Sequence, residues 1–324
     1  MRPQQYQPLK PMDAQSYLDA ALSAGSRRAA KRTHRGADRE AHMRAMEQYR
    51  FLTIRDTLTA SLQKLHDSYP SFDQMSEFLL QLFEQDLEVR RVKQALGGIH
   101  GLLSVLGALT KESIARMRDA RSIDQILRVR AAYIGRVSSI TRQAQKHLLL
   151  LDAARGVLRN LPSIDDELFT VAIAGFPNVG KSTLLSLLTT AKPEIKPYAF
   201  TTKGLNVGYF DYRYNPIQCV DTPGTLNRKA PSAVERKAEI AIKYLAHIIV
   251  YIFDPTEGGY TLAQQDELYR RTLGVGKPVL IYVSKTDIVD AEVVRMLSET
   301  YPEVHTSSET LKKAIGKAFR AEFL

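Results

Sequence analysis

The stretch Gly175-Phe176-Pro177-Asn178-Val179-Gly180-Lys181-Ser182 decides the fold of this chain. It has the spacing G-x-x-x-x-G-K-S and lies between a β-branched run ending at Ala174 and an apolar helical run over 183–188. The glycines allow backbone N–H groups to turn toward an anion, and the following helix N-terminus adds partial positive charge. Lys181 and Ser182 would supply a cation for phosphate and a hydroxyl for Mg²⁺. The pattern alone also fits a Gly-rich turn that ends in Lys-Ser by chance.

Short β-branched runs alternate with helical runs after residue 160. The expected strands are 171–174, 205–212, 217–220, 248–253 and 279–284, and the expected helices include 232–245, 262–273 and 292–300. This alternation predicts a mostly parallel sheet with helices on both faces. Ligands of such sheets bind at the carboxyl ends of the strands, so the Gly-rich loop is expected at that edge.

The first 160 residues have a helical periodicity instead. Apolar residues recur near helical spacing from Met43 to Leu65, Tyr49 among them, and again as one continuous run from Leu127 to Leu151. These patterns predict an antiparallel bundle of three or four long helices after a short N-terminal arm. The segment 161–166 breaks the periodicity, which predicts two domains, 1–160 and 161–324.

Capping patterns set the expected helix ends in this half. We expect Gly25 to end the first helix. Helix starts are predicted at Asp13 and at two capping-box patterns, Ser71 with Gln74 and Ser122 with Gln125.

The charge of the chain is unevenly distributed. The 324 residues carry a net charge of +10, and residues 1–160 hold 26 Lys and Arg against 16 Asp and Glu. Nine of these cations fall within 27–55. This imbalance favours an anionic partner, nucleic acid first, although charged residues on helices are often only solvated.

Cysteine content and hydropathy indicate which cellular compartment suits the chain and whether it spans a membrane. The single Cys219 excludes an internal disulfide and fits a reducing compartment, so we expect a cytoplasmic protein with Cys219 as a buried apolar residue. No apolar run is expected to reach membrane-spanning length, and the longest, 248–253, is interpreted as a buried strand.

Two segments offer further oxygen ligands near the phosphates. Asp221-Thr222-Pro223-Gly224 follows the strand 217–220, where Asp221 can hold Mg²⁺ through water and the Gly224 N–H can sense a γ-phosphate. The preceding segment 199–202 offers Thr202, with Thr201 as second choice, to complete the Mg²⁺ shell. Each segment alone is also an ordinary turn or polar loop.

Two later segments have the chemistry to bind a guanine base. Ser284-Lys285-Thr286-Asp287 ends the fifth strand, and the Asp287 carboxylate can accept from both guanine N1–H and the exocyclic amine. The aliphatic stem of Lys285 can cover the base. The backbone at Ser307 and Ser308 can contact the guanine carbonyl. The order of these segments at successive strand ends predicts a guanine-nucleotide site.

The predicted site residues fall into three groups. The nucleotide contacts are Gly175, Pro177, Asn178, Val179, Gly180, Lys181, Ser182, Thr183, Asp221, Gly224, Ser284, Lys285, Asp287, Ser307 and Ser308. The predicted metal ligands are Ser182, Thr202 and Asp221. The predicted catalytic groups are Lys181, Thr202, Gly224 and Asn178.

These segments resemble the Obg-like GTPases, and most closely the nucleolar GTP-binding protein family of ribosome assembly in its short archaeal form. The resemblance is carried by 175–182, Pro197-Tyr-Ala-Phe-Thr-Thr-Lys-Gly204, 205–208, 221–224 and 252–255. It implies an α/β P-loop GTPase domain preceded by an all-α bundle. It also implies hydrolysis of GTP to GDP with Mg²⁺, coupled to maturation of the large ribosomal subunit, with the basic bundle on ribosomal RNA.

Three residues bear on catalysis and affinity. Ser284 stands where the family has Asn, so we expect weaker nucleotide binding with an intact guanine preference. Thr225 replaces the Gln that orients water in many GTPases, so intrinsic hydrolysis should be slow, near ~10⁻⁴ s⁻¹. Asn178 matches a position that ligates K⁺ in related GTPases, which predicts K⁺ stimulation; the alternative is that it only bonds the loop backbone.

Three functions remain open from the sequence. The leading one is a GTP-hydrolysing switch in large-subunit assembly, monomeric off the ribosome. The second is an RNA-binding assembly scaffold whose nucleotide is structural and slowly hydrolysed. The third is a membrane-surface GTPase, which ranks last because the Arg-rich arm has no interleaved Trp.

Overall fold

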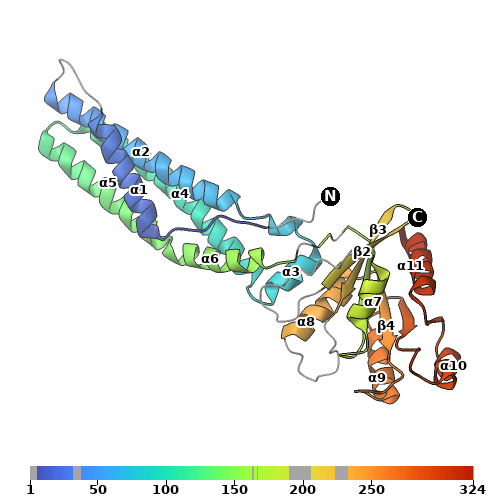
Figure 1. Ribbon diagram of the computed structural model, residues 1–324. Coiled ribbons are helices and arrows are strands. Elements are labelled where there is room, and N and C mark those ends of the chain that lie inside the picture. The colour runs from blue at the N-terminus through green and yellow to red at the C-terminus, as the bar shows by residue number, and fades with distance from the viewer. Residues whose placement is uncertain are drawn as a thin grey trace. The chain divides into compact units, whose positions relative to one another are not determined.

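The computed structural model describes residues 6–31, 38–162, 164–165, 167–189, 206–222 and 233–323. Thr201, Thr202, Gly224 and Thr225, on which several sequence predictions depend, lie outside these ranges. The described residues form two compact units, one of 6–75 and 86–159 and the other of 76–85 and 160–323 (Figure 1). Each unit is described by itself below.

The first unit is a helical bundle, as its periodicity predicts. Its elements are α1 (Ala14–Ala30), α2 (Arg39–Asp67), the 3₁₀ turn η1 (Phe72–Gln74), α4 (Val89–Asp119), α5 (Ile123–Gln143) and α6 (Gln145–Arg159). Tyr133 of α5 lies at its centre: its ring stacks on Phe51 with centroids 4.0 Å apart, and its hydroxyl donates to the Phe51 carbonyl at 3.1 Å. Tyr133 therefore joins α5 to α2 by both packing and hydrogen bonding.

Close contact between α1 and α2 overrides the helix stop expected at Gly25. The helix continues to Ala30, and a Cβ at Gly25 would lie 2.7 Å from Ile54 Cγ1. The glycine therefore permits a close helix–helix approach instead of ending the helix. On α2, Phe51 is buried, as are Ile54, Leu58, Leu62 and Leu65, whereas Tyr49, expected in the apolar stripe, is 42% exposed.

Another helix prediction is corrected by tertiary structure. The hydroxyl of Ser71 caps nothing; Ser76 instead accepts from the Leu79 N–H and begins the short helix α3 (Glu77–Glu84). The apolar run from Leu127 to Leu151 is divided between two helices, α5 and α6, which meet at Ala144. Leu127, at the start of that run, is 37% exposed.

The capping pattern at Ser122 is half correct. Ser122 Oγ accepts from the Gln125 N–H at 3.3 Å, as expected of an N-cap. The Gln125 side chain accepts from the Arg121 N–H at 2.6 Å, one residue before the position a capping box requires.

Helix α4 has an apolar middle that the sequence reading passed over. Its uncharged run from Ala95 to Thr110 is longer than the strand 248–253 named above as the longest. In the part of the chain that the structure describes, α4 is the one helix with the length and hydropathy of a membrane span. Ten of its residues are buried within the bundle unit, among them Ile99, Leu102 and Leu106.

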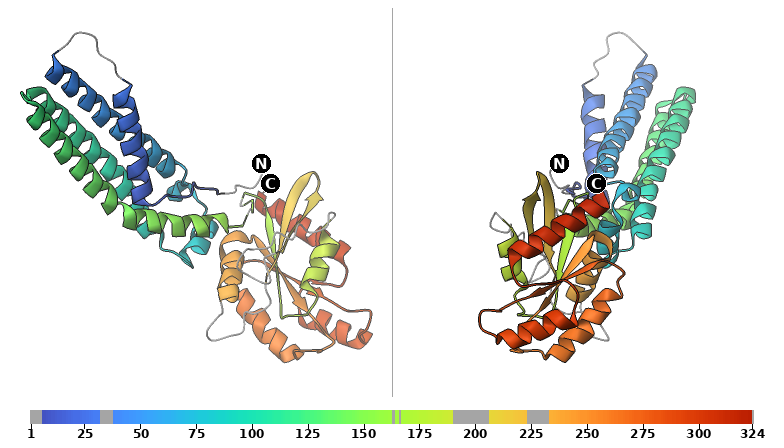
Figure 2. Two further views of the ribbon diagram at one scale, coloured as in Figure 1. Left: turned by 60° about the vertical axis from the view of Figure 1, so that its left-hand side comes forward. Right: turned by 90° about the vertical axis from the view of Figure 1, so that its right-hand side faces the viewer.

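The second unit is a six-stranded sheet in the order β2-β3-β1-β4-β5-β6, parallel except for β2 (Figure 2). Its strands are β1 (Thr170–Ala174), β2 (Asn206–Tyr212), β3 (Asn215–Asp221), β4 (Ile248–Phe253), β5 (Val279–Val283) and β6 (Val304–His305). Its helices are α3, α7 (Lys181–Leu188), α8 (Ala233–Ile240) with the π turn η2 (Ala241–Leu245), α9 (Leu262–Leu273), α10 (Ala291–Thr300) and α11 (Ser308–Phe323). α7 and α11 contact each other on one face, and η2 and α9 lie on the other.

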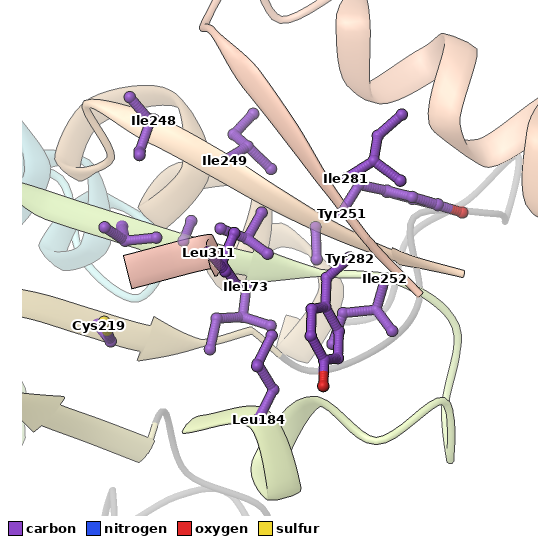
Figure 3. Packing of buried hydrophobic residues seen from close by; sticks show 14 of the residues in the cluster. Ile173, Leu184, Cys219, Ile248, Ile249, Tyr251, Ile252, Ile281, Tyr282 and Leu311 are labelled. Carbon is purple, nitrogen blue, oxygen red and sulfur yellow. The ribbon is translucent and has the colours of Figure 1, made fainter. Parts of the chain in front are cut away.

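The sheet core explains why its central strands are continuous apolar runs. Every residue of β1 and β4 is buried, because helices cover both faces of a parallel sheet. Ile173, Leu184, Ile249 and Cys219 belong to this core (Figure 3). Burial raises the pKa of the Cys219 thiol to about 12, so it stays protonated and acts as the small apolar residue predicted.

Strand register determines which chain segments meet at the carboxyl edge. Ile173 pairs with both Asp221 of β3 and Val250 of β4. Phe253 of β4 pairs with Val283 of β5. The loop after β1, the end of β3 and the residues after β4 and β5 therefore converge at one edge of the sheet.

Candidate nucleotide-binding site

The loop after β1 has the backbone conformation that a phosphate cradle needs. Gly175 has φ +146°, Asn178 φ +64° and Gly180 φ +97°, and α7 begins at the next residue, Lys181. A Cβ at Gly175 would lie 3.0 Å from the Ile252 carbonyl oxygen, so only glycine fits there. Pro177 is half-buried, Val179 is buried and Asn178 is exposed. The loop therefore leads directly into a helix N-terminus, where N–H groups favour an anion.

Lys181 extends back across this loop. Its side chain is buried, and Nζ donates to the carbonyl of Phe176 at 2.7 Å and of Gly175 at 3.1 Å. The ammonium group is thus held within the loop by its own carbonyls. A phosphate in the loop would meet a cation that is already positioned.

Asp221 has the oxygen chemistry of a Mg²⁺ site. Its Oδ2 accepts from Ser182 Oγ at 2.6 Å and from Asn206 Nδ2 at 3.3 Å. Its Oδ1 is buried and has no hydrogen-bond partner within the described ranges. An unpaired carboxylate oxygen beside a hydroxyl fits a hard divalent cation, which prefers oxygen ligands. Ser182 and Asp221 are therefore placed together as the sequence predicts.

The segment after β5 lies beside the phosphate loop. A Cβ at Gly180 would lie 3.6 Å from Ser284 Cβ. Both N–H and Oγ of Ser284 donate to the Phe253 carbonyl, at 2.9 and 3.2 Å. The Ser284 hydroxyl is therefore committed to the end of β4. Asp287 is exposed at the turn that follows.

The remaining predicted contacts are at the surface of this unit. Thr183 is exposed in the first turn of α7. Ser307 and Ser308 follow β6, and Ser307 Oγ accepts from the Thr310 N–H at 3.3 Å at the start of α11. Ser307 therefore has a capping role at α11 in addition to any contact with a base.

Asp254 is a site residue that the sequence predictions did not include. Its carboxylate accepts from Lys285 Nζ at 2.5 Å and from both the N–H and the hydroxyl of Thr256. Burial by itself raises the pKa of Asp254, but the hydrogen bonds from Lys285 and Thr256 hold this pKa below its ordinary value. The available signal was its position directly after the buried strand β4, at the edge where ligands bind.

Asp254 is itself fixed by a buried glutamine. Gln265 of α9, 1% exposed, accepts from the Asp254 N–H at 2.8 Å and donates to the Asp254 carbonyl at 2.9 Å. Gln265 also donates to the Tyr260 carbonyl, and the Tyr260 ring stacks on Phe176 with centroids 3.9 Å apart. The loop after β4 thus supports both the phosphate loop and Lys285.

Replacing Asp254 by Asn is expected to weaken GDP binding about tenfold, because a charge-assisted hydrogen bond that positions Lys285 is lost. Titration of a fluorescent GDP analogue would measure this. Glu267→Gln, which breaks the exposed pair with Arg271, is the matched control and should leave affinity unchanged. Lys285→Met should add no further loss in the Asp254→Asn background; additive losses would show that the two side chains act independently.

Both units of the chain resemble known protein families. The family described as the NOG1 N-terminal helical domain matches residues 9–165, and the 50S ribosome-binding GTPase family matches residues 170–285. An uncharacterized protein of Methanocaldococcus jannaschii is 37% identical over 256 residues, which cover 78% of this chain and 72% of that protein. Nucleolar GTP-binding protein 1 of Arabidopsis thaliana is 29% identical over 312 residues, 94% of this chain.

The chain belongs to the nucleolar GTP-binding protein family. It spans about half the length of the Arabidopsis member, because the alignment covers 46% of that protein. A solved structure of a Plasmodium falciparum nucleolar GTP-binding protein 1 aligns with 50% of this chain and 93% of its own, at 25% identity and a TM-score of 0.40. As a member of this family, the chain is a GTP-binding protein with a helical N-terminal domain and a P-loop GTPase domain.

Proposed function

We propose that this chain is a GTP-hydrolysing switch in large ribosomal subunit assembly, and that its basic helical unit binds ribosomal RNA. The observation that carries the enzymatic part is the buried, unpaired Asp221 Oδ1 beside Ser182 and the Gly-rich loop. This arrangement supports a Mg²⁺–nucleotide site, and the family supports guanine as the base. The ribosomal part rests on the relatives and on the charge of residues 1–160.

The proposed reaction is in-line attack of water on the γ-phosphate. The loop N–H groups would bind the β- and γ-phosphates, and Lys181 would stabilise the negative charge that spreads over the transferred group. Ser182 and Asp221 would hold Mg²⁺, which neutralises phosphate charge when bound. Asp287 would select guanine, and Lys285, positioned by Asp254, would cover the base.

Multiple-turnover GTP hydrolysis, with and without large-subunit particles, tests the switch. We expect slow hydrolysis by the chain alone and at least about tenfold faster hydrolysis when Na⁺ is replaced by K⁺, because K⁺ at Asn178 would supply charge to the transition state. Asn178→Ala should remove the K⁺ response, so that its rates in K⁺ and Na⁺ become equal. Equal rates of the wild type in K⁺ and Na⁺ would contradict the role of Asn178. Bound GTP that is not turned over, even on particles, would favour the assembly scaffold with a structural nucleotide.

A further inference from the structure

Some arginines of the helical unit have partners within the unit, but others are exposed and have no ion pair or side-chain hydrogen bond to a described residue: Arg39, Arg90, Arg91, Arg118, Arg121 and Arg159. Those with partners form ion pairs or bonds to carbonyls: Arg50 and Arg130 with Glu47, Arg116 and Arg136 with Glu112, Arg128 with Asp124, and Arg44 with the Ala120 carbonyl. Their charges are partly compensated by the bundle itself.

Three further unpaired cations lie at the end of α1, and these three line a hollow. Arg27, Arg28 and Lys31 are exposed, and none has an ion pair or side-chain hydrogen bond to any described residue. Basic side chains in a last helical turn also complement the helix dipole. The helix dipole does not explain, however, why these three side chains line a hollow.

The hollow lies between α1 and α2 and has a volume of about 620 Å³. Its lining from α1 is Ala24, Arg27, Arg28 and Lys31, and its lining from α2 is Tyr49, Thr53 and Thr57. Both sets fall on one face of their helix, at spacings of three or four residues. Gly25 lies next to Ala24, and a Cβ there would lie 2.7 Å from Ile54 Cγ1 of α2, so the walls of the hollow are two tightly packed helices.

The hydroxyl groups in the hollow are acceptors for a ligand. Thr53 Oγ1 donates to the Tyr49 carbonyl at 2.8 Å, and Thr57 Oγ1 donates to the Thr53 carbonyl at 2.8 Å. Each hydroxyl hydrogen is thus used within α2, and the oxygen lone pairs remain. A ligand of this hollow must therefore carry negative charge for the cations and O–H or N–H donors for the threonines.

We propose that this α1–α2 hollow, lined by Arg27, Arg28, Lys31, Tyr49, Thr53 and Thr57, binds the RNA backbone. The cations would contact phosphates, and the threonine oxygens would accept from ribose 2′-hydroxyls, which are donors that DNA lacks. The Tyr49 ring, 42% exposed, provides a surface for a sugar or base. This inference rests on the proposed RNA binding of the helical unit and specifies where that binding occurs.

Binding of a fluorescein-labelled RNA hairpin to the full chain, measured by anisotropy across a salt series, tests the assignment. The variant Arg27→Gln/Arg28→Gln/Lys31→Gln is compared with Arg116→Gln/Arg128→Gln/Arg136→Gln, which removes the same charge from ion-paired positions. We expect at least a tenfold loss for the first variant, and a fall in its salt slope by about 1 for each cation. The control should lose less than about threefold.

The outcomes separate the site from the function. Suppose that the wild type binds the hairpin and that the two variants lose affinity equally, or that neither variant loses affinity. The hollow is then not the site, while RNA binding by the chain still stands. If the wild type does not bind the hairpin at ~0.1 M salt, the proposed RNA binding itself is overturned, and the hollow with it.

A second variant tests the 2′-hydroxyl contact without changing charge. Thr53→Val/Thr57→Val should weaken binding of the RNA hairpin about fivefold and leave a DNA hairpin of the same sequence unaffected, because only RNA offers the donors. Equal losses for RNA and DNA, or wild-type binding that does not distinguish them, would overturn the assigned role of the threonines. If about 10 mM inorganic phosphate displaced the RNA, the hollow would be a site for free phosphate instead.

Discussion

Replacing Lys181 by alanine is expected to reduce GTP and GDP affinity by at least about 100-fold. The ammonium group is buried and already lies within the loop, 2.7 Å from the Phe176 carbonyl oxygen and 3.1 Å from that of Gly175. A phosphate would replace these neutral acceptors with charged ones, and hydrogen bonds between charged groups contribute about 1.5–3 kcal/mol each. Two such bonds correspond to a loss of this size. Titration of a fluorescent GDP analogue would measure it.

Folding must be separated from binding in this variant, because Lys181 also bonds the loop backbone. Lys181→Met keeps the buried aliphatic stem, and circular dichroism with thermal melting would show whether either variant is folded. Lys317→Ala, on the exposed side of α11, removes one lysine away from the loop and should bind normally. A folded Lys181→Met protein with wild-type affinity for GDP would show that the loop does not bind nucleotide as proposed.

Replacing Asp287 by Asn is expected to change the preferred base from guanine to xanthine. The carboxylate accepts from two guanine donors, whereas an amide places an N–H₂ group that matches the additional carbonyl of xanthine. A site built to hydrogen-bond a base strongly rejects the analogue that leaves its groups unpaired, so GTP affinity should fall about 100-fold while XTP affinity rises. Competition between the two triphosphates for a fluorescent GDP analogue would measure both changes.

The position of Asp287 makes this substitution structurally mild. It is exposed at a turn in which the Ile288 N–H donates to the Lys285 carbonyl at 3.2 Å, and this bond does not involve its side chain. Glu299→Gln, at an exposed ion pair with Arg295 on α10, is the matched control. If Asp287→Asn lost GTP without gaining XTP, Asp287 would act on the site by charge and not by recognition of the base.

The sequence alone predicts features that depend on a short stretch of chain. The two glycines of the phosphate loop, the helix that begins at Lys181 and the continuous apolar strands follow from backbone sterics and from burial on both faces of a sheet. Ser182 and Asp221 meet for a related reason: the loop after β1 leads into α7 at Lys181, and Asp221 ends β3, the strand that pairs with β1.

The errors arise where distant parts of the chain meet. Gly25 resembles a helix stop until α2 is packed against it, and Ser71 resembles a cap until Ser76 takes that role. The support of Lys285 by Asp254 depends on the register of β4 against β5, which a single sequence does not reveal. The hollow on α1 and α2 depends on how these two helices pack, which a single sequence does not reveal either.

The stacking of Tyr260 on Phe176 has an optical consequence. The chain has 15 tyrosines and no tryptophan, so its intrinsic emission averages over the whole molecule and hides this one contact. An indole introduced at position 260 would be the sole tryptophan of the protein, with its ring against the second residue of the phosphate loop. Its fluorescence would follow the loop directly, without a label on the nucleotide or on the RNA.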